Sequence, residues 1–88
     1  MGRLLMTHQI NATREENKKF ADEIQKALQR YASCDWGDLT ESDKNLNDEA
    51  VKSGNDRILA AFATSEGKIY IITEWDRSYT TVLFADEY

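Results

Sequence analysis

The stretch from Lys68 to Phe84, KIYIITEWDRSYTTVLF, has the strongest pattern in the chain and decides the fold. β-branched and aromatic residues alternate on either side of a short polar break at Asp76, Arg77 and Ser78. A period-two repeat of these residue types is typical of strands that bury one face. The stretch therefore predicts a β-hairpin whose tip is the polar break.

Two further strands are expected around this hairpin. Residues 57–64, RILAAFAT, alternate in the same way and lead into a tight turn that contains Gly67. Residues 3–10, RLLMTHQI, place Leu4, Met6, His8 and Ile10 on one side and predict a first strand. The alternation does not determine which edge of the sheet this first strand occupies.

A long amphipathic helix is expected between the first two strands. Thr13 and Glu16 match a capping box, so the helix should run from about Ala12 or Arg14 to Ala32. Its apolar face repeats at spacings of four, four and three, in the order Phe20, Ile24, Leu28 and Tyr31. A stripe with this period is expected to cover the sheet and form the core.

A second helix should begin after Thr40, a favoured N-cap residue, and reach about Lys52 or Ser53 before the left-handed terminator Gly54. The predicted order of elements is then β-α-α-β-β-β. This order predicts an α+β fold in two layers, an antiparallel sheet with both helices on one face. A chain of 88 residues should form it as one domain, residues 1–88.

The net charge of −5 is concentrated in the middle of the chain. Residues 35–56 hold seven acids against Lys44 and Lys52, which equals the charge of the whole chain. An acidic surface repels nucleic-acid phosphates and attracts basic partners, so direct binding of nucleic acid is not expected. A solvated helix surface that keeps a small protein in solution is the simpler reading of the same charge.

Candidates for chemistry are few, because His8 is the single histidine and Cys34 the single cysteine. A catalytic pair would need a third group to orient it, and the sequence indicates none. Both residues are interpreted as structural, and neither a metal nor another cofactor is expected. One cysteine cannot form an internal disulfide and no apolar run is long enough for a bilayer, so a cytoplasmic protein without a membrane segment is predicted.

Two surfaces are candidate partner-binding sites. The first is the hairpin tip with Trp75, Asp76 and Arg77, since tryptophan and arginine are favoured binding anchors. An equally supported alternative is that Arg77 pairs with Asp76 or Glu74 and only fixes the turn. The second surface is the acidic segment, with these candidate residues: Asp35, Trp36, Asp38, Asp43, Asp48 and Glu49. Within it, Trp36 is read first as a core anchor and second as an exposed contact.

Two segments carry a resemblance to a known group of proteins. CDWGDL at residues 34–39 and ITEWDRSYTTVLF at residues 72–84, with the closing Glu87 and Tyr88, resemble small "plasmid-related" proteins of bacterial plasmids, integrative elements and phages. The resemblance spans about Arg3 to Tyr88 and implies a cytoplasmic accessory protein of a mobile genetic element. Small acidic proteins of that origin are often inhibitors of host defence, of the anti-CRISPR or DNA-mimic kind.

The leading hypothesis is a non-catalytic protein-binding accessory protein whose partner is a basic or nucleic-acid-binding host protein. The alternative is a small enzyme that uses His8 or the acids around Trp36. A homodimer stays open, since the pattern does not say whether a sheet edge is free for pairing.

Overall fold

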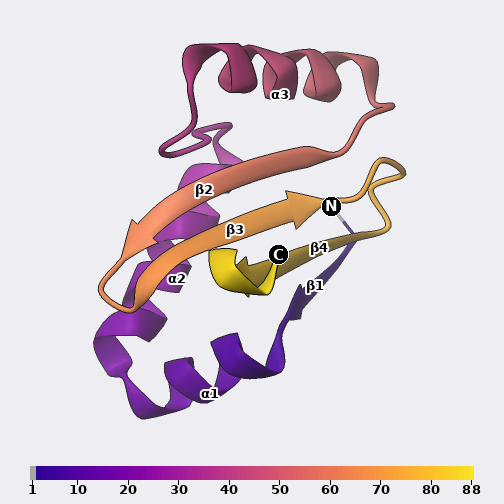
Figure 1. The fold of residues 1–88 in the computed structure, drawn as a ribbon. Coiled ribbons are helices and arrows are strands. Elements are labelled where there is room, and N and C mark those ends of the chain that lie inside the picture. The colour runs from indigo at the N-terminus through magenta and orange to yellow at the C-terminus, as the bar shows by residue number, and fades with distance from the viewer. Residues whose placement is uncertain (1) are drawn as a thin grey trace.

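Three α-helices and a four-stranded sheet make up the structure, a computed structural model that describes residues 2–88. Figure 1 shows the elements in this order: β1 (Arg3–Met6), α1 (His8–Glu16), α2 (Lys18–Ala32), α3 (Glu41–Ser53), β2 (Ile58–Thr64), β3 (Gly67–Thr73), β4 (Tyr79–Phe84) and the 3-10 helix η1 (Ala85–Glu87). The predicted α+β class is confirmed. The sheet, however, is mixed rather than antiparallel throughout.

The predicted hairpin lies at the centre of the sheet. β3 and β4 pair antiparallel with Ile71 opposite Val82, and β2 pairs antiparallel with the other side of β3. The last three strands therefore form an antiparallel meander. β3 ends at Thr73, so Trp75 belongs to the turn and not to the strand.

β1 lies at the outer edge beside β4 and runs parallel to it, so the prediction of an antiparallel sheet is wrong for this strand. The chain enters the sheet at the β3–β4 turn, where the amides of Gly2 and Arg3 donate to the carbonyls of Arg77 and Ser78 over 3.1 Å. These bonds join residues 2 and 3 to a turn that lies 75 positions further along the chain. A local sequence pattern therefore carries no information on the direction of this strand.

The first strand is shorter than predicted, because the chain leaves the sheet after Met6. The Thr7 hydroxyl oxygen accepts a hydrogen bond from the Ile10 amide and caps α1. Residues 8–10, which were expected in the strand, are therefore helical. Ile10 is fully buried as a helix residue and not as a strand residue.

A break at Asn17 divides the predicted long helix into α1 and α2. Asn17 has an extended backbone with φ −133°, and its side-chain oxygen accepts a hydrogen bond from the Phe20 amide over 3.2 Å. Thr13 lies inside α1, where its hydroxyl donates to the Gln9 carbonyl. The predicted capping box at Thr13 is therefore wrong, and the cap of the amphipathic helix is Asn17.

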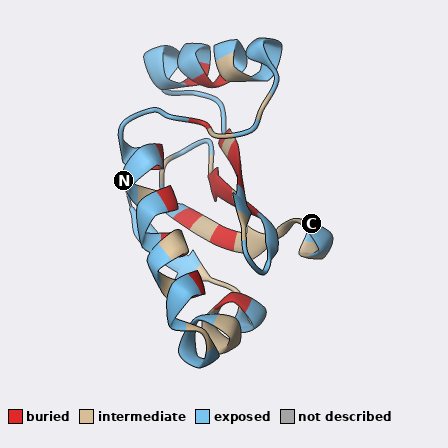
Figure 2. Cartoon of the chain, turned by 90° about the vertical axis from the view of Figure 1, so that its left-hand side faces the viewer, coloured by how far each residue is buried: buried red, intermediate tan, exposed pale blue. Residues whose placement is uncertain are grey.

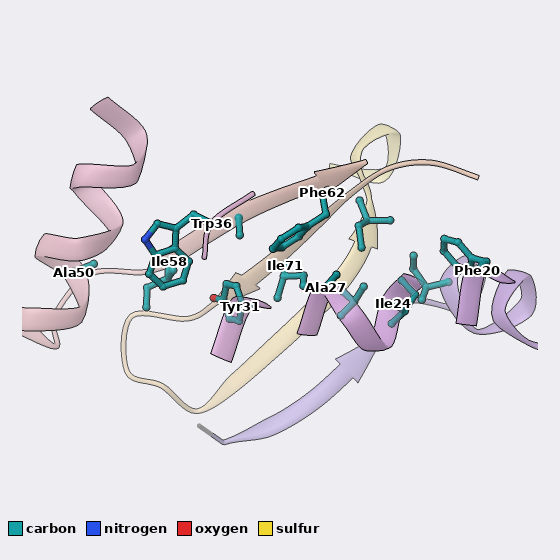
Figure 3. Packing of buried hydrophobic residues seen from close by; sticks show 13 residues of the cluster. Phe20, Ile24, Ala27, Tyr31, Trp36, Ala50, Ile58, Phe62 and Ile71 are labelled. Carbon is teal, nitrogen blue, oxygen red and sulfur yellow. The ribbon is translucent and has the colours of Figure 1, made fainter. Parts of the chain in front are cut away.

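The apolar stripe of α2 packs across one face of the sheet, as Figures 2 and 3 show. Phe20, Ile24 and Tyr31 are at most 4% exposed, while Leu28 of the same stripe is half-buried. The strands contribute alternate residues to this core, namely Ile58, Ala60, Phe62, Ile69, Ile71 and Val82. The predicted core stripe is therefore confirmed.

α3 begins and ends where the sequence predicts. The Thr40 hydroxyl oxygen accepts a hydrogen bond from the Asp43 amide, and Gly54 ends the helix with a left-handed φ of 71°. In Figures 1 and 2, α3 lies beside the edge of β2, while α2 lies across a face of the sheet. This placement differs from the predicted single helical layer, because α3 buries only the side chains of Asn47 and Ala50.

The outer edge of β2 is closed by α3 and by the loop that precedes it. The Asn47 side-chain amide donates to the Leu59 carbonyl over 2.8 Å and accepts from the Leu59 amide over 3.3 Å. Further along the strand, the Ala61 amide donates to the Trp36 carbonyl, and the Asp38 amide donates to the Ala61 carbonyl. These contacts use the backbone groups to which another strand would otherwise bind.

Candidate functional site

Arg77, a predicted binding anchor, is engaged inside the protein. Its guanidinium donates to the backbone carbonyls of Ala50 at 2.8 Å, Asp56 at 2.6 Å and Glu74 at 3.1 Å. The alternative in which it pairs with a turn carboxylate is wrong, since its partners are carbonyls. Arg77 therefore ties the C-terminus of α3 to the β3–β4 turn.

The rest of the predicted hairpin tip divides into one fixed and one free side chain. The Asp76 carboxylate accepts from the Ser78 hydroxyl at 2.6 Å and from the Ser78 amide at 3.1 Å. The hydrogen bond from the Ser78 hydroxyl is the main reason that the pKa of Asp76 lies below its usual value. Trp75 is 64% exposed at the tip, so it is the turn residue that presents an apolar surface to solvent.

Several residues of the acidic segment have internal partners. Asp35 accepts from Arg30 Nε at 2.7 Å and from the Gly37 amide at 3.1 Å. The bond from Arg30 is the main reason that the pKa of Asp35 is lowered. Trp36 is 4% exposed and donates through Nε1 to Asp48 at 3.0 Å. Trp36 is thus a core anchor, and these two acids hold the loop around it.

The other predicted acids of this segment lie on the surface. Asp38, Asp43 and Glu49 are exposed. Asp43 alone among them lines a hollow, the one between α3 and β2. This hollow is the site that sequence analysis missed.

The hollow, here called the α3–β2 groove, has a volume of about 340 Å³ and is lined by Leu39, Asp43, Leu46, Asn47, Arg57 and Leu59. Leu46 is 66% exposed, and it lies beside Leu39 and Leu59 in the lining of this groove rather than alone on the surface. The sequence signal was available in the helical spacing. Asn47 and Ala50 mark the buried side of α3, and Leu46 lies beside that side rather than on it.

A second hollow of about 230 Å³ lies on the α2 side of α3 and includes Tyr31, Cys34, Thr73 and Arg77. Figure 3 shows Tyr31 near Trp36 in the core, where the two rings pack edge to face with centroids 5.4 Å apart. The Tyr31 hydroxyl is 2.7 Å from Thr73 Oγ1, and burial raises the pKa of Tyr31. Cys34 and Arg77 both have left-handed backbones here, with φ 62° and 63°. The Tyr31 hydroxyl contact and the Arg77 guanidinium contact with Ala50 each join two different segments.

His8 and Cys34, which the sequence analysis interprets as structural, are not brought together. His8 begins α1, and Cys34 follows α2; Figure 1 places these segments at different ends of the fold. Among residues 2–88, no group of three or more His, Cys, Asp or Glu could hold a metal ion. Within the same residues, no helix is long and apolar enough to cross a membrane.

Comparison with protein-family models, curated protein sequences and solved structures found no match to this chain. The resemblance to plasmid-related proteins therefore stays a prediction. The function is inferred from the α3–β2 groove and from the charge around it.

Proposed function

We propose that this chain is a non-catalytic protein-binding domain whose α3–β2 groove takes a basic, amphipathic segment of a protein partner. The observation that carries this proposal is Leu46, which lines the groove and is 66% exposed. An exposed leucine beside a hollow of about 340 Å³ is the kind of surface that a partner side chain fills.

The apolar part of the groove supports a helix or an extended segment with aliphatic side chains. Leu39 and Leu59 are half-buried on its floor, and Leu46 stands on its α3 wall. Burial of these side chains by a partner would remove apolar surface from water, at about 25 cal/mol per Å². A short segment with one or two leucine-sized anchors is enough to use this surface.

The charge around the groove favours a basic partner. Asp43 lies in the groove itself, and Glu49 is exposed on the same helix. The segment from residue 35 to residue 56 has seven acids and two bases, a net charge of −5. Arg57 lines the groove as well, but its guanidinium is directed to Tyr88, with which it makes a hydrogen bond and a cation–π contact of 5.5 Å.

The proposal extends to the biological role that the resemblance implies. A host protein that binds nucleic acid presents basic surfaces, and the acidic segment of residues 35–56 beside the groove would compete for them as phosphates do. On this proposal the chain is a mobile-element accessory protein that inhibits a host defence system. The enzymatic alternative has less support, because Asp35 and Asp48 near Trp36 are held by internal bonds.

Titration of the ¹⁵N-labelled protein with a synthetic amphipathic helical peptide of lysine and leucine tests the proposal. We expect the largest amide shifts at Leu39, Leu46 and Leu59. Leu46→Glu should abolish them, because a carboxylate would be buried in an apolar contact. The substitution also adds a negative charge, which increases the nonspecific attraction of the protein for the basic peptide. A loss of binding would therefore come from the changed groove and not from the changed charge.

Val51→Glu is the matched control, since Val51 is 45% exposed on α3 but lines the second hollow. It adds the same charge and should retain the shifts. Equal binding by wild type and Leu46→Glu, or shifts centred on Trp75, would overturn the groove as the binding site.

A further inference from the structure

The outer edge of β1 is open for pairing. The amides of Arg3 and Thr7 donate to the carbonyls of Ser78 and Val82 on the β4 side. Backbone groups of a strand face alternate sides, so the amides and carbonyls of Leu4 and Met6 point outward. β1 is the last strand of the sheet on this side, and Figure 1 shows no element of the described chain beyond it.

The two edges of the sheet therefore differ in whether their outward backbone groups have hydrogen-bond partners. Asn47 and the loop before α3 satisfy the outward groups of Leu59 and Ala61 on β2. β1 contains no proline, and its protection against pairing is limited to its length of four residues and to Arg3 at its start. Its central residues, Leu4 and Leu5, are instead 49% and 36% exposed.

We propose that β1 pairs with β1 of a second copy of this chain, antiparallel about a twofold axis through Leu5. In this register, the outward groups of Leu4 bond those of Met6 in the second copy, and the reverse pair follows from symmetry. The pairing joins two four-stranded sheets into one continuous sheet. It requires no change in the bonds between β1 and β4.

The side chains of the edge are complementary to themselves in this register. Leu5 meets Leu5 of the second copy in a non-hydrogen-bonded pair, the arrangement that brings side chains closest. Leu5 continues a row with Thr81, Ile72 and Leu59 on the sheet face opposite α2. On the other face, Leu4 packs beside Met6 of the second copy.

Electrostatics and register also favour a second copy. Arg3 is opposite Thr7 of the second copy, so no like charges meet across the axis. A shift of the register by one residue would place the outward amide of Leu4 opposite Leu5 of the second copy, whose backbone groups face β4. The hydrogen bonds between the two strands would then be lost. The strand has four residues, so the interface is small, and we expect a dissociation constant on the order of 100 µM.

Sedimentation equilibrium from about 10 µM to about 1 mM, a range that brackets this constant, tests the proposal. Wild type should pass from monomer to dimer. Leu4→Pro removes an outward amide that has no partner within one copy, and Leu5→Lys opposes two like charges at the axis. Each should raise the dissociation constant at least tenfold, whereas Leu46→Lys, equally polar but in the groove, should leave it unchanged.

Circular dichroism of each variant establishes that it is folded, and amide hydrogen exchange gives an independent readout on wild type. Protection of the Leu4 and Met6 amides should rise with protein concentration, while that of Leu5 stays constant. A wild type that stays monomeric over the whole range would overturn the proposal. So would a dimer whose concentration-dependent protection lies outside β1, which would assign the contact to another surface such as the groove.

Discussion

Arg77 shows how one side chain can hold together segments that are far apart in the sequence. It bonds the carbonyls of Ala50, Asp56 and Glu74 while its own backbone has a left-handed φ of 63°. The contacts must therefore outweigh the backbone cost, which is about 1–2 kcal/mol for a residue with a Cβ atom. This balance can be measured by two substitutions at the same position.

Arg77→Ala should lower the free energy of unfolding by about 2–3 kcal/mol, because it deletes several charge-assisted bonds to backbone carbonyls and keeps the strained backbone. Arg77→Gly deletes the same bonds but relieves the strain, so it should be about 1 kcal/mol more stable than Arg77→Ala. Urea unfolding followed by circular dichroism gives both values. Equal stability of the two variants would mean that the backbone is not strained at this position.

The buried hydroxyls of Tyr31, Thr73 and Thr80 form a chain with distances of 2.7 and 2.8 Å. Burial raises the pKa of Tyr31, so the folded protein holds this proton more tightly than the unfolded chain. Above about pH 10, the unfolded chain releases its proton first, and stability falls as the pH rises towards the folded pKa. The stabilisation is fully present at neutral pH.

Tyr31→Phe should therefore cost about 1 kcal/mol at pH 7, where Thr73 and Thr80 still bond each other. It should also flatten the loss of stability that wild type shows above about pH 10. Tyr79→Phe, at a site that is 38% exposed, is the control and should leave the slope as in wild type. Unfolding measured against pH decides it, and equal slopes for wild type and Tyr31→Phe would contradict the role of Tyr31.

At the residue scale, composition identified the right residue types but not their partners. The sequence favoured Trp36 as a core anchor, and it is buried. It could not show that Asp48 would accept the indole hydrogen, or that Arg77 would reach Ala50 across 27 positions. Such contacts depend on how separate elements meet, and a local pattern contains no information about that.

Asn17 decides where the amphipathic helix begins. Its side chain caps the Phe20 amide, whereas Thr13 lies inside α1 and bonds the Gln9 carbonyl. Asn17→Ala should cost about 1 kcal/mol, and Thr13→Ala should change stability by less than about 0.5 kcal/mol. Thermal or urea unfolding of both variants distinguishes the two positions. A larger loss from Thr13→Ala would restore the predicted capping box.

The elements that were predicted well carry their own signals. The hairpin has period-two alternation, and α3 is bounded by Thr40 and Gly54, which act within one turn of the helix. The region from residue 3 to residue 17 was misread, because Leu, Met and Ile suit strands and helices alike. The caps at Thr7 and Asn17 determine where the strand ends and where the two helices begin. Neighbouring residues such as Thr13 are also favoured as caps, so the sequence did not single out these two.

The direction of β1 also could not be predicted from a local sequence pattern. Its parallel pairing with β4 depends on α1 and α2, which return the chain across one face before α3 and the meander begin. Register between strands 76 positions apart, such as Arg3 and Tyr79, is set by the assembled fold. Helical spacing places Leu46 beside the buried side of α3, but it does not show that Leu59 of β2 lines the same groove.

At the scale of the whole molecule, negative charge and apolar surface meet at α3. The open edge of β1 lies at the other side of the sheet, beyond β4 and β3. A copy paired through β1 and a partner seated in the groove would therefore use different sides of one molecule. The two proposals are independent, and a dimer would present two grooves to a partner with repeated basic segments.

The charge and the leucine of the groove should act on different steps of binding. Long-range attraction acts before contact, so Asp43→Asn with Glu49→Gln, which changes the net charge from −5 to −3, should slow association with the lysine–leucine peptide. Dissociation should change little. Leu46→Ala should do the reverse and speed dissociation by about tenfold, the equivalent of about 1.4 kcal/mol.

Stopped-flow measurements at low and high salt separate these effects. Glu15→Gln with Glu16→Gln is the control, because it makes the same change in net charge on α1, away from the groove. The α3 pair should slow association several-fold more than the α1 pair at low salt, and the difference should vanish at about 1 M salt, where the Debye length is about 3 Å. If both pairs slow association equally, the peptide responds to net charge alone. The acids of α3 would then have no special part in recognition, and binding in the groove would depend on its leucines.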